Sequence, residues 1–261
     1  MLEHRSLKQD RIALSAAAAS LLAAVLLLAG CSAFFDFNLL KGLDKPSAPT
    51  ASDYQGSGGL DKLAKDLSSP AIVSALAGDP AATAGIDAYL KSLYGTPQEQ
   101  QAAALDADLN LKTTSGDVLV NNAVTFAVSG GASGKTVQQI LQEIVPANVA
   151  SDSTAFTAMV NGLLAAEAAY QVLGATVPPA PADVNMGDAA QKAVVAYTMD
   201  SLITFIGGGT AAATTQMFNL MNNPSAYTGP TGNMPDPFSG LPGNPAWLGN
   251  IITAAGAPMP S

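Results

Sequence analysis

The stretch DSTAFTAMVNGLLAAEAAYQVL, residues 152–173, decides the fold. Its large apolar residues recur at the three- and four-residue spacing of one helix face. Asp152 stands where an N-cap is expected, and Gly174 is placed as the C-cap. The stretch is rich in Ala, and Glu167 and Tyr170 interrupt its apolar face. We therefore predict a long helix that lies in a protein core and does not span a membrane.

A second long helix is predicted further along the chain, over Asp188–Ile206, with residues 207–209, all glycine, at its end. It is also apolar and rich in Ala, and Lys192 interrupts it. A third helix is expected to follow at Thr210–Met221. The two long helices are the predicted core of the domain.

Shorter helices precede these two, and their expected starts carry capping residues. Ser69-Pro70 and Asp79-Pro80 each place a capping residue before a proline at the first helical position. Residues 96–99, TPQE, have the pattern of a capping box. Residues 117–128 fit a helix and also a strand, and we favour the helix. A short helix is expected at Thr136–Val145. This succession predicts an all-α protein, an array of short helical hairpins with two longer core helices.

Two segments of different composition flank the predicted helical domain, which spans residues 59–222. Residues 31–58 precede it, and much of that segment is rich in Pro, Ser, Ala and Gly, which is typical of a flexible tether. Residues 223–261 follow it as a Pro/Gly-rich loop and one last helix, predicted to pack on the domain. Aromatic and Met side chains near 217–247 favour either a partner surface or a plug over the helical core.

Charge and residue usage restrict the chemistry. The 261 residues include 20 acidic and 11 basic ones, for a net charge of −9, which argues against nucleic acid as a partner. From residue 31 onward the chain has no Arg and no His. This excludes a Ser-His-Asp system and a His-ligated metal site in that part. We expect a protein that is not an enzyme and carries no cofactor.

One weak candidate for nucleotide binding lies at residues 129–136, SGGASGKT, which resemble the loop of a P-loop NTPase. Gly134, Lys135 and Thr136 match the end of that motif, where amides, a lysine and a hydroxyl hold phosphates and magnesium. The first glycine of the motif falls on Ser129, and the motif requires a strand before it. The alternative is a Gly/Ser turn between two helices, with Lys135 in solvent.

A weak calcium candidate lies at residues 106–117, DADLNLKTTSGD, which resemble an EF-hand loop. The side chains at positions one, three, five, nine and twelve would be Asp106, Asp108, Asn110, Thr114 and Asp117. Position six, normally glycine, is Leu111. The alternative is that the first two aspartates end a helix on different faces.

The N-terminus predicts export. Residues 12–29 carry no charge and follow a segment with three basic residues, which is the pattern of an export signal. The run ends in residues 28–31, Leu-Ala-Gly-Cys, and this order resembles the lipobox of bacterial lipoproteins. The resemblance implies a signal peptide over residues 1–30, cleavage between Gly30 and Cys31, and lipid on the thiol of Cys31. The alternative is an uncleaved signal anchor, because the apolar run is close to the length that spans a bilayer.

The same resemblance predicts a place in the cell envelope. In many two-membrane bacteria an Asp after the lipidated cysteine retains a lipoprotein in the inner membrane, and Ser32 stands there instead, which favours the outer membrane. The expected partners are the lipid bilayer, through acylated Cys31, and an unidentified envelope protein. Two functions stay open: a helical scaffold, or a ligand-binding accessory of an envelope transport system with an apolar pocket between the long helices.

Overall fold

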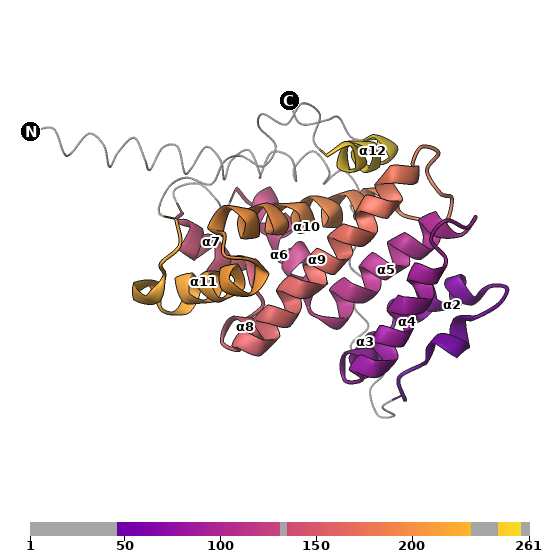
Figure 1. Ribbon diagram of the computed structural model, residues 1–261, viewed down its shortest axis with the longest axis horizontal. Helices are drawn as coiled ribbons and strands as arrows, with labels where there is room; N and C mark the ends of the chain where they lie inside the picture. The colour runs from indigo at the N-terminus through magenta and orange to yellow at the C-terminus, as the bar shows by residue number, and fades with distance from the viewer. Residues whose placement is uncertain (1–45, 131–134, 231–244, 257–261) are drawn as a thin grey trace, which may run out of the picture.

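The computed structural model describes residues 46–130, 135–230 and 245–256. Every regular element in these ranges is helical, which confirms the all-α prediction (Figure 1). The elements are η1 (Ala51–Tyr54), α2 (Gly59–Leu67), α3 (Pro70–Ala77), α4 (Pro80–Ser92), α5 (Glu99–Thr113), α6 (Gly116–Val128), α7 (Val137–Ile144), α8 (Ala147–Ala150), α9 (Ser153–Thr176), α10 (Met186–Ile206), α11 (Thr210–Asn222), η2 (Pro224–Ala226) and α12 (Ala246–Ala254).

The two predicted long helices are α9 and α10, and both lie in the core. Asp152 caps α9 as expected, because its carboxylate accepts hydrogen bonds from the amides of Thr154 and Ala155. The side chain of Asn185 caps α10 by accepting from the amide of Asp188, so this helix begins at Met186, earlier than predicted. Helix α9 makes its most extensive contact with α5, beside which it runs in Figure 1.

The predicted C-cap of α9 is wrong, because Gly174 lies inside the helix, which continues to Thr176. A Cβ on Gly174 would stand 2.2 Å from the carbonyl oxygen of Trp247, on α12. Gly162 has a similar role, since a Cβ there would stand 2.8 Å from the carbonyl oxygen of Asn110 on α5. These glycines therefore allow the backbones of α12 and α5 to approach α9 closely.

Helix α5 separates two hydrophobic clusters and contributes to both. Its residues Leu105 and Leu109 pack with α2, α3 and α4 in the smaller cluster. Ala107 and Leu111 face the larger cluster, which is formed mainly by α6 and the helices after it. Figure 1 shows this division, with α2 to α4 on one side of α5 and α9 on the other. A helix that is buried on two sides cannot be strongly amphipathic.

The predicted capping box before α5 is not formed. Helix α5 begins at Glu99. The carboxylate of Glu99 accepts a hydrogen bond from the amide of Gly95 instead of that of Thr96. The hydroxyl of Thr96 accepts from the amide of Gln98 at 3.2 Å, one residue earlier than a capping box requires. The two halves of the motif are therefore each displaced by one residue.

The tether prediction is wrong from residue 51 onward. Residues Ala51–Tyr54 form the 3₁₀-helix η1, and the side chain of Tyr54 is fully buried in the smaller cluster. Its hydroxyl donates to Asp66 at 3.0 Å, and its carbonyl accepts from the hydroxyl of Tyr89 at 3.0 Å. Burial of one aromatic ring with satisfied polar groups fixes a segment whose overall composition is typical of a linker.

Helices α11 and α12 both contribute to the larger cluster. Met217 and Met221 are buried, and the rings of Phe156 and Phe218 lie 5.7 Å apart. On α12, the ring of Trp247 meets that of Tyr197 edge to face at 6.1 Å. These residues fill the core, which favours the plug interpretation over a partner surface. The loop residues 231–244 lie outside the described part of the chain.

Candidate functional site: an acidic pocket beside helix α5

The calcium-loop hypothesis is contradicted by helix α5. Asp106, Asp108 and Asn110 all lie inside this helix, so no loop encircles an ion there. Helical residues two apart are rotated by roughly 200° about the axis, which sends Asp106 and Asp108 to different faces. Asp117 lies in the first turn of α6, where its carboxylate accepts from the amide of Val118. The predicted ligands therefore belong to separate surroundings.

Asp106 belongs to a buried network between α4 and α5, which we call the Asp106 centre. Its side chain is fully buried. One carboxyl oxygen accepts from the hydroxyl of Tyr94 at 2.6 Å, and the other accepts from the amide of Asn110 at 3.0 Å. Asp106 also shares a hydrogen bond with Asp87. Lys91, at 2.7 Å from Asp87, completes the network on the exposed side.

In the Asp106 centre, the carboxyl groups of Asp106 and Asp87 share one proton. Burial, together with the hydrogen bond from Asp106 to Asp87, raises the pKa of Asp106 to about 7. Burial also acts to raise the pKa of Asp87, but hydrogen bonds from Asp106, Lys91 and Asn110 outweigh it and lower that pKa. Asp106 is therefore the protonated donor and Asp87 the carboxylate. Because Asp106 is sealed from solvent, this acid does not reach a substrate.

Asp108 belongs to a second network between α5 and α10, which we call the Asp108 centre. The ammonium of Lys192 lies 2.7 Å from Oδ1 of Asp108 and 2.5 Å from Oδ2 of Asp188. Lys112 lies 3.7 Å from Oδ2 of Asp108, which is too far for a strong hydrogen bond. Lys192 thus joins two helices by binding one oxygen of each carboxylate.

The side chain of Lys192 stays protonated. Burial disfavours its ammonium, but the carboxylates of Asp108 and Asp188 outweigh that cost and raise its pKa above the ordinary value. Burial also raises the pKa of Asp188, and the attraction of Lys192 opposes this. A lysine that stays charged and bound to two carboxylates is a poor base or nucleophile.

A pocket of about 180 Å³ opens beside the Asp108 centre, between α2, α5, α9 and the start of α10. Its lining includes the carboxylates of Asp108, Asp183 and Asp188, with no lysine among the described residues. The apolar part comes from residues such as Leu105 and Ala189. This volume lies below the roughly 300–1,000 Å³ of sites for drug-sized ligands. The pocket is therefore acidic and suits a small ligand.

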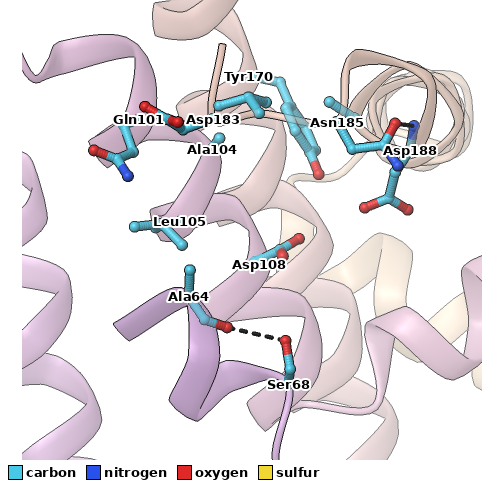
Figure 2. A pocket seen from close by; sticks show the side chains of 12 residues that line it. Ala64, Ser68, Gln101, Ala104, Leu105, Asp108, Tyr170, Asp183, Asn185 and Asp188 are labelled. Carbon is cyan, nitrogen blue, oxygen red and sulfur yellow. Dashed lines mark hydrogen bonds between the residues drawn. The ribbon is translucent and has the colours of Figure 1, made fainter. Parts of the chain in front are cut away.

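Tyr170 enters this pocket from α9. The residue is 1% exposed, and Figure 2 shows its hydroxyl pointing toward the space between Asp108 and Asp188. No hydrogen bond joins this hydroxyl to any residue that the structure describes. Burial, followed by the charges of Asp108 and Asp188, raises its pKa well above the ordinary value, so the hydroxyl is neutral. A hydroxyl that faces a pocket without a protein partner is a place where a ligand or water binds.

The pocket differs from the one the sequence analysis described. We expected apolar walls between the two long helices, and the observed pocket has a mixed lining with three carboxylates and includes α2 and α5. Near Tyr197 the long helices pack against Trp247, and Met199 is buried. The pairing of Asp188, which lines the pocket, with Lys192 beside it was not predicted, although an Asp four positions before a Lys on one helix is a visible pairing signal.

The P-loop resemblance fails at its first element. The segment before residues 129–136 is helix α6, so the strand of that motif is absent from residues 116–128. Thr136 caps α7, where its hydroxyl accepts from the amide of Gln139, and the ammonium of Lys135 pairs with Glu143. Gly134 lies outside the described residues. The described part of the segment agrees with a connection between two helices.

The residues of the predicted lipid anchor, Gly30, Cys31 and Ser32, lie outside the described part of the chain. Among the residues that the structure does describe, none of the helices has the length and hydropathy needed to cross a bilayer.

Comparisons with family models, with curated proteins and with solved structures give no significant match to this chain.

Proposed function

We propose that this chain is an exported bacterial lipoprotein that holds a helical, non-catalytic domain at the surface of a membrane. The observation that carries the proposal is the sequence Leu-Ala-Gly-Cys at residues 28–31, directly after a charge-free run that follows basic residues. Two or three acyl chains on one cysteine give stable membrane binding, since each buried CH₂ contributes about 0.8 kcal/mol.

A role in binding is supported by the state of the reactive side chains. Lys192 is held by two carboxylates, and Lys135 forms an exposed ion pair with Glu143. Asp106, an acid whose pKa is raised to about 7, is sealed inside the protein. None of these groups is both free and accessible to a substrate. The domain then acts by binding a second molecule, either an envelope protein on its helical surface or a small ligand.

The acidic pocket favours the second of these binding roles. A scaffold needs a solid core, whereas a ligand-binding accessory of a transport system needs a cavity connected to solvent. The pocket beside Asp108 supplies such a cavity, and the hydroxyl of Tyr170 faces it without a described partner. We therefore rank a lipid-anchored ligand-binding protein above a pure scaffold.

The lipid anchor is tested by intact mass. The full-length gene is expressed in a two-membrane bacterium, and the protein is purified from the membrane fraction beside the Cys31→Ala variant. We expect a wild-type mass equal to residues 31–261 plus acyl chains, and loss of those chains in the variant. The Ser32→Ala variant, which keeps the cysteine, is the control and should remain acylated. An unprocessed mass of residues 1–261 in both wild type and Cys31→Ala would contradict the proposal.

The choice of membrane is tested by fractionation. The proposal predicts that the wild-type protein is recovered with the outer membrane. The Ser32→Asp variant should move to the inner membrane, if this chain follows the sorting rule that its lipobox implies. Recovery of both proteins in the same membrane would contradict the outer-membrane assignment and leave the lipid attachment intact.

A further inference from the structure

The polar groups at the inner end of the acidic pocket are incompletely bonded. Lys192 binds one oxygen each of Asp108 and Asp188. The remaining oxygen of Asp188 has no hydrogen bond from a described residue, and the remaining oxygen of Asp108 has only Lys112, at 3.7 Å. The hydroxyl of Tyr170, on a side chain that is 1% exposed, points toward the same space (Figure 2).

We propose that this pocket binds the primary ammonium group of a small amine. The ammonium would donate its three N–H groups to Tyr170, Asp108 and Asp188. Three donors are what a primary ammonium offers, and three acceptors with spare capacity face the inner end of the pocket. This inference deepens the ligand-binding role proposed above by naming the chemical class of the ligand.

The charge of the lining selects a cation. Three carboxylates line the pocket, and the nearest lysines, Lys112 and Lys192, are not part of its described lining. The third carboxylate belongs to Asp183, which is exposed and lines the pocket. It adds negative potential where a ligand approaches. An anionic ligand would meet the carboxylate oxygens that Lys192 does not bind and is disfavoured.

The same lining does not suit a metal ion. In the described ranges, no set of three or more acidic, His or Cys side chains is placed to hold one. Calcium takes six to eight oxygen ligands, and one oxygen each of Asp108 and Asp188 is already bound to Lys192. An organic cation needs only a few acceptors and gains from the apolar wall that Leu105 contributes.

The test is a titration with ethylammonium chloride of the purified full-length protein in an amine-free buffer with detergent. Ligand-observed NMR measures the binding. A ligand of three heavy atoms is expected to bind with a Kd on the order of millimolar. The Tyr170→Phe variant keeps the ring and removes the hydroxyl, and it should weaken binding by roughly 3- to 10-fold. The Asp188→Asn variant should weaken it by more than about 10-fold.

Matched controls separate the pocket from general effects. Tyr227→Phe removes a tyrosine hydroxyl that donates to Pro230, and Glu143→Gln removes a carboxylate paired with Lys135. Neither side chain lines the pocket, so both variants should bind ethylammonium like the wild type. Tetramethylammonium, which has no N–H donor, should bind at least about 10-fold more weakly. Helical circular dichroism of each variant checks that it folds.

Two results would overturn the inference. One is that ethylammonium shows no binding to the protein, and that vesicles show none that ethylammonium can compete with. The other is binding that Tyr170→Phe leaves unchanged, because a ligand in this pocket must contact that hydroxyl. If Asp188→Asn does not fold, the Tyr170→Phe result decides alone.

The source of the amine is a separate arm of the test. Vesicles with phosphatidylethanolamine present a primary ammonium on a lipid headgroup, and vesicles with phosphatidylcholine present a quaternary one. Competition by the first only would assign the site to the headgroup, and no competition would assign it to a soluble amine. Failure of amine binding would leave the acylated mass of the wild-type protein unaffected, so it is distinguishable from failure of the anchor proposal.

Discussion

The Asp106 centre and the Asp108 centre begin two residues apart on helix α5 and differ in how their tyrosines are used. In the Asp106 centre, the hydroxyl of Tyr94 donates to the buried carboxyl at 2.6 Å. In the Asp108 centre, the hydroxyl of Tyr170 has no partner among the described residues and faces a pocket. The first centre is closed and fully bonded, and the second is open and incompletely bonded.

This difference indicates two kinds of buried polarity. Buried polar groups are stabilising when every donor and acceptor is satisfied, and the Asp106 centre meets that condition with a shared proton. The Asp108 centre keeps acceptors in reserve, and the hydroxyl of Tyr170 faces its pocket without a partner among the described residues. Hydrogen-bonding groups that are unused and face a pocket are available to a ligand or to water. The predictions below test the closed centre as structure and the open centre as a site.

The largest effect is expected from Lys192→Met. Removing the ammonium leaves Asp108 and Asp188 facing each other with no cation between them, and breaking a buried ion pair in this way costs about 3–5 kcal/mol of unfolding free energy. Urea denaturation measures this cost. Lys135→Met, which removes an exposed ion pair with Glu143, is the control and should cost less than about 1 kcal/mol. Equal losses in the two variants would contradict a structural role for the buried lysine.

The next effect is the pH dependence that Asp106 contributes. Its pKa is about 7 in the folded protein and 3.8 for an ordinary aspartate, so between these values the folded state binds more protons than the unfolded state. Stability from this group is therefore full below about pH 3.8 and falls as pH rises toward 7. At roughly 1.4 kcal/mol per unit, the loss approaches about 4 kcal/mol.

The Asp106→Asn variant isolates this contribution. Its amide donates to Asp87 at every pH, as the protonated carboxyl does at low pH, so the variant should lose much less stability than the wild type between pH 5 and pH 8. Glu167, whose pKa burial also raises to about 7, contributes equally in both proteins and cancels. Glu143→Gln is the control for charge removal. Parallel pH profiles for wild type and Asp106→Asn would show that Asp106 is not the titrating group.

The sequence predicted the parts of this fold that depend on local spacing. Apolar periodicity located α9 and α10, and the capping position of Asp152 is correct. Positions that depend on distant packing were missed. Gly174 has the local signature of a helix end, but the approach of Trp247 from α12 explains it. Tyr54 sits in linker composition, but its ring fills a cluster built by α2 to α5.

The same limit applies to the candidate site. The polar interruptions Tyr170 and Lys192 were visible in two apolar helices, but only as exceptions to a pattern. Their meeting point depends on Asp108, which lies 84 positions from Lys192 in the chain. The spacing of the acidic residues around Asp106 and Asp108 resembles a calcium loop only if this segment is assumed not to be helical. Once α5 forms, its rotation separates the two carboxylates and creates one structural centre and one binding site.

The most direct test of this comparison is the unfolding free energy of Tyr94→Phe and Tyr170→Phe, each against wild type and without added amine. Both substitutions remove one hydroxyl and keep the ring. Tyr94→Phe should cost about 1–3 kcal/mol, because it leaves an oxygen of buried Asp106 without its donor. Tyr170→Phe should change stability by less than about 0.5 kcal/mol, because its hydroxyl has no partner to lose. Equal losses in the two variants would show that Tyr170 is already bonded in the free protein, and would contradict the assignment of an open site.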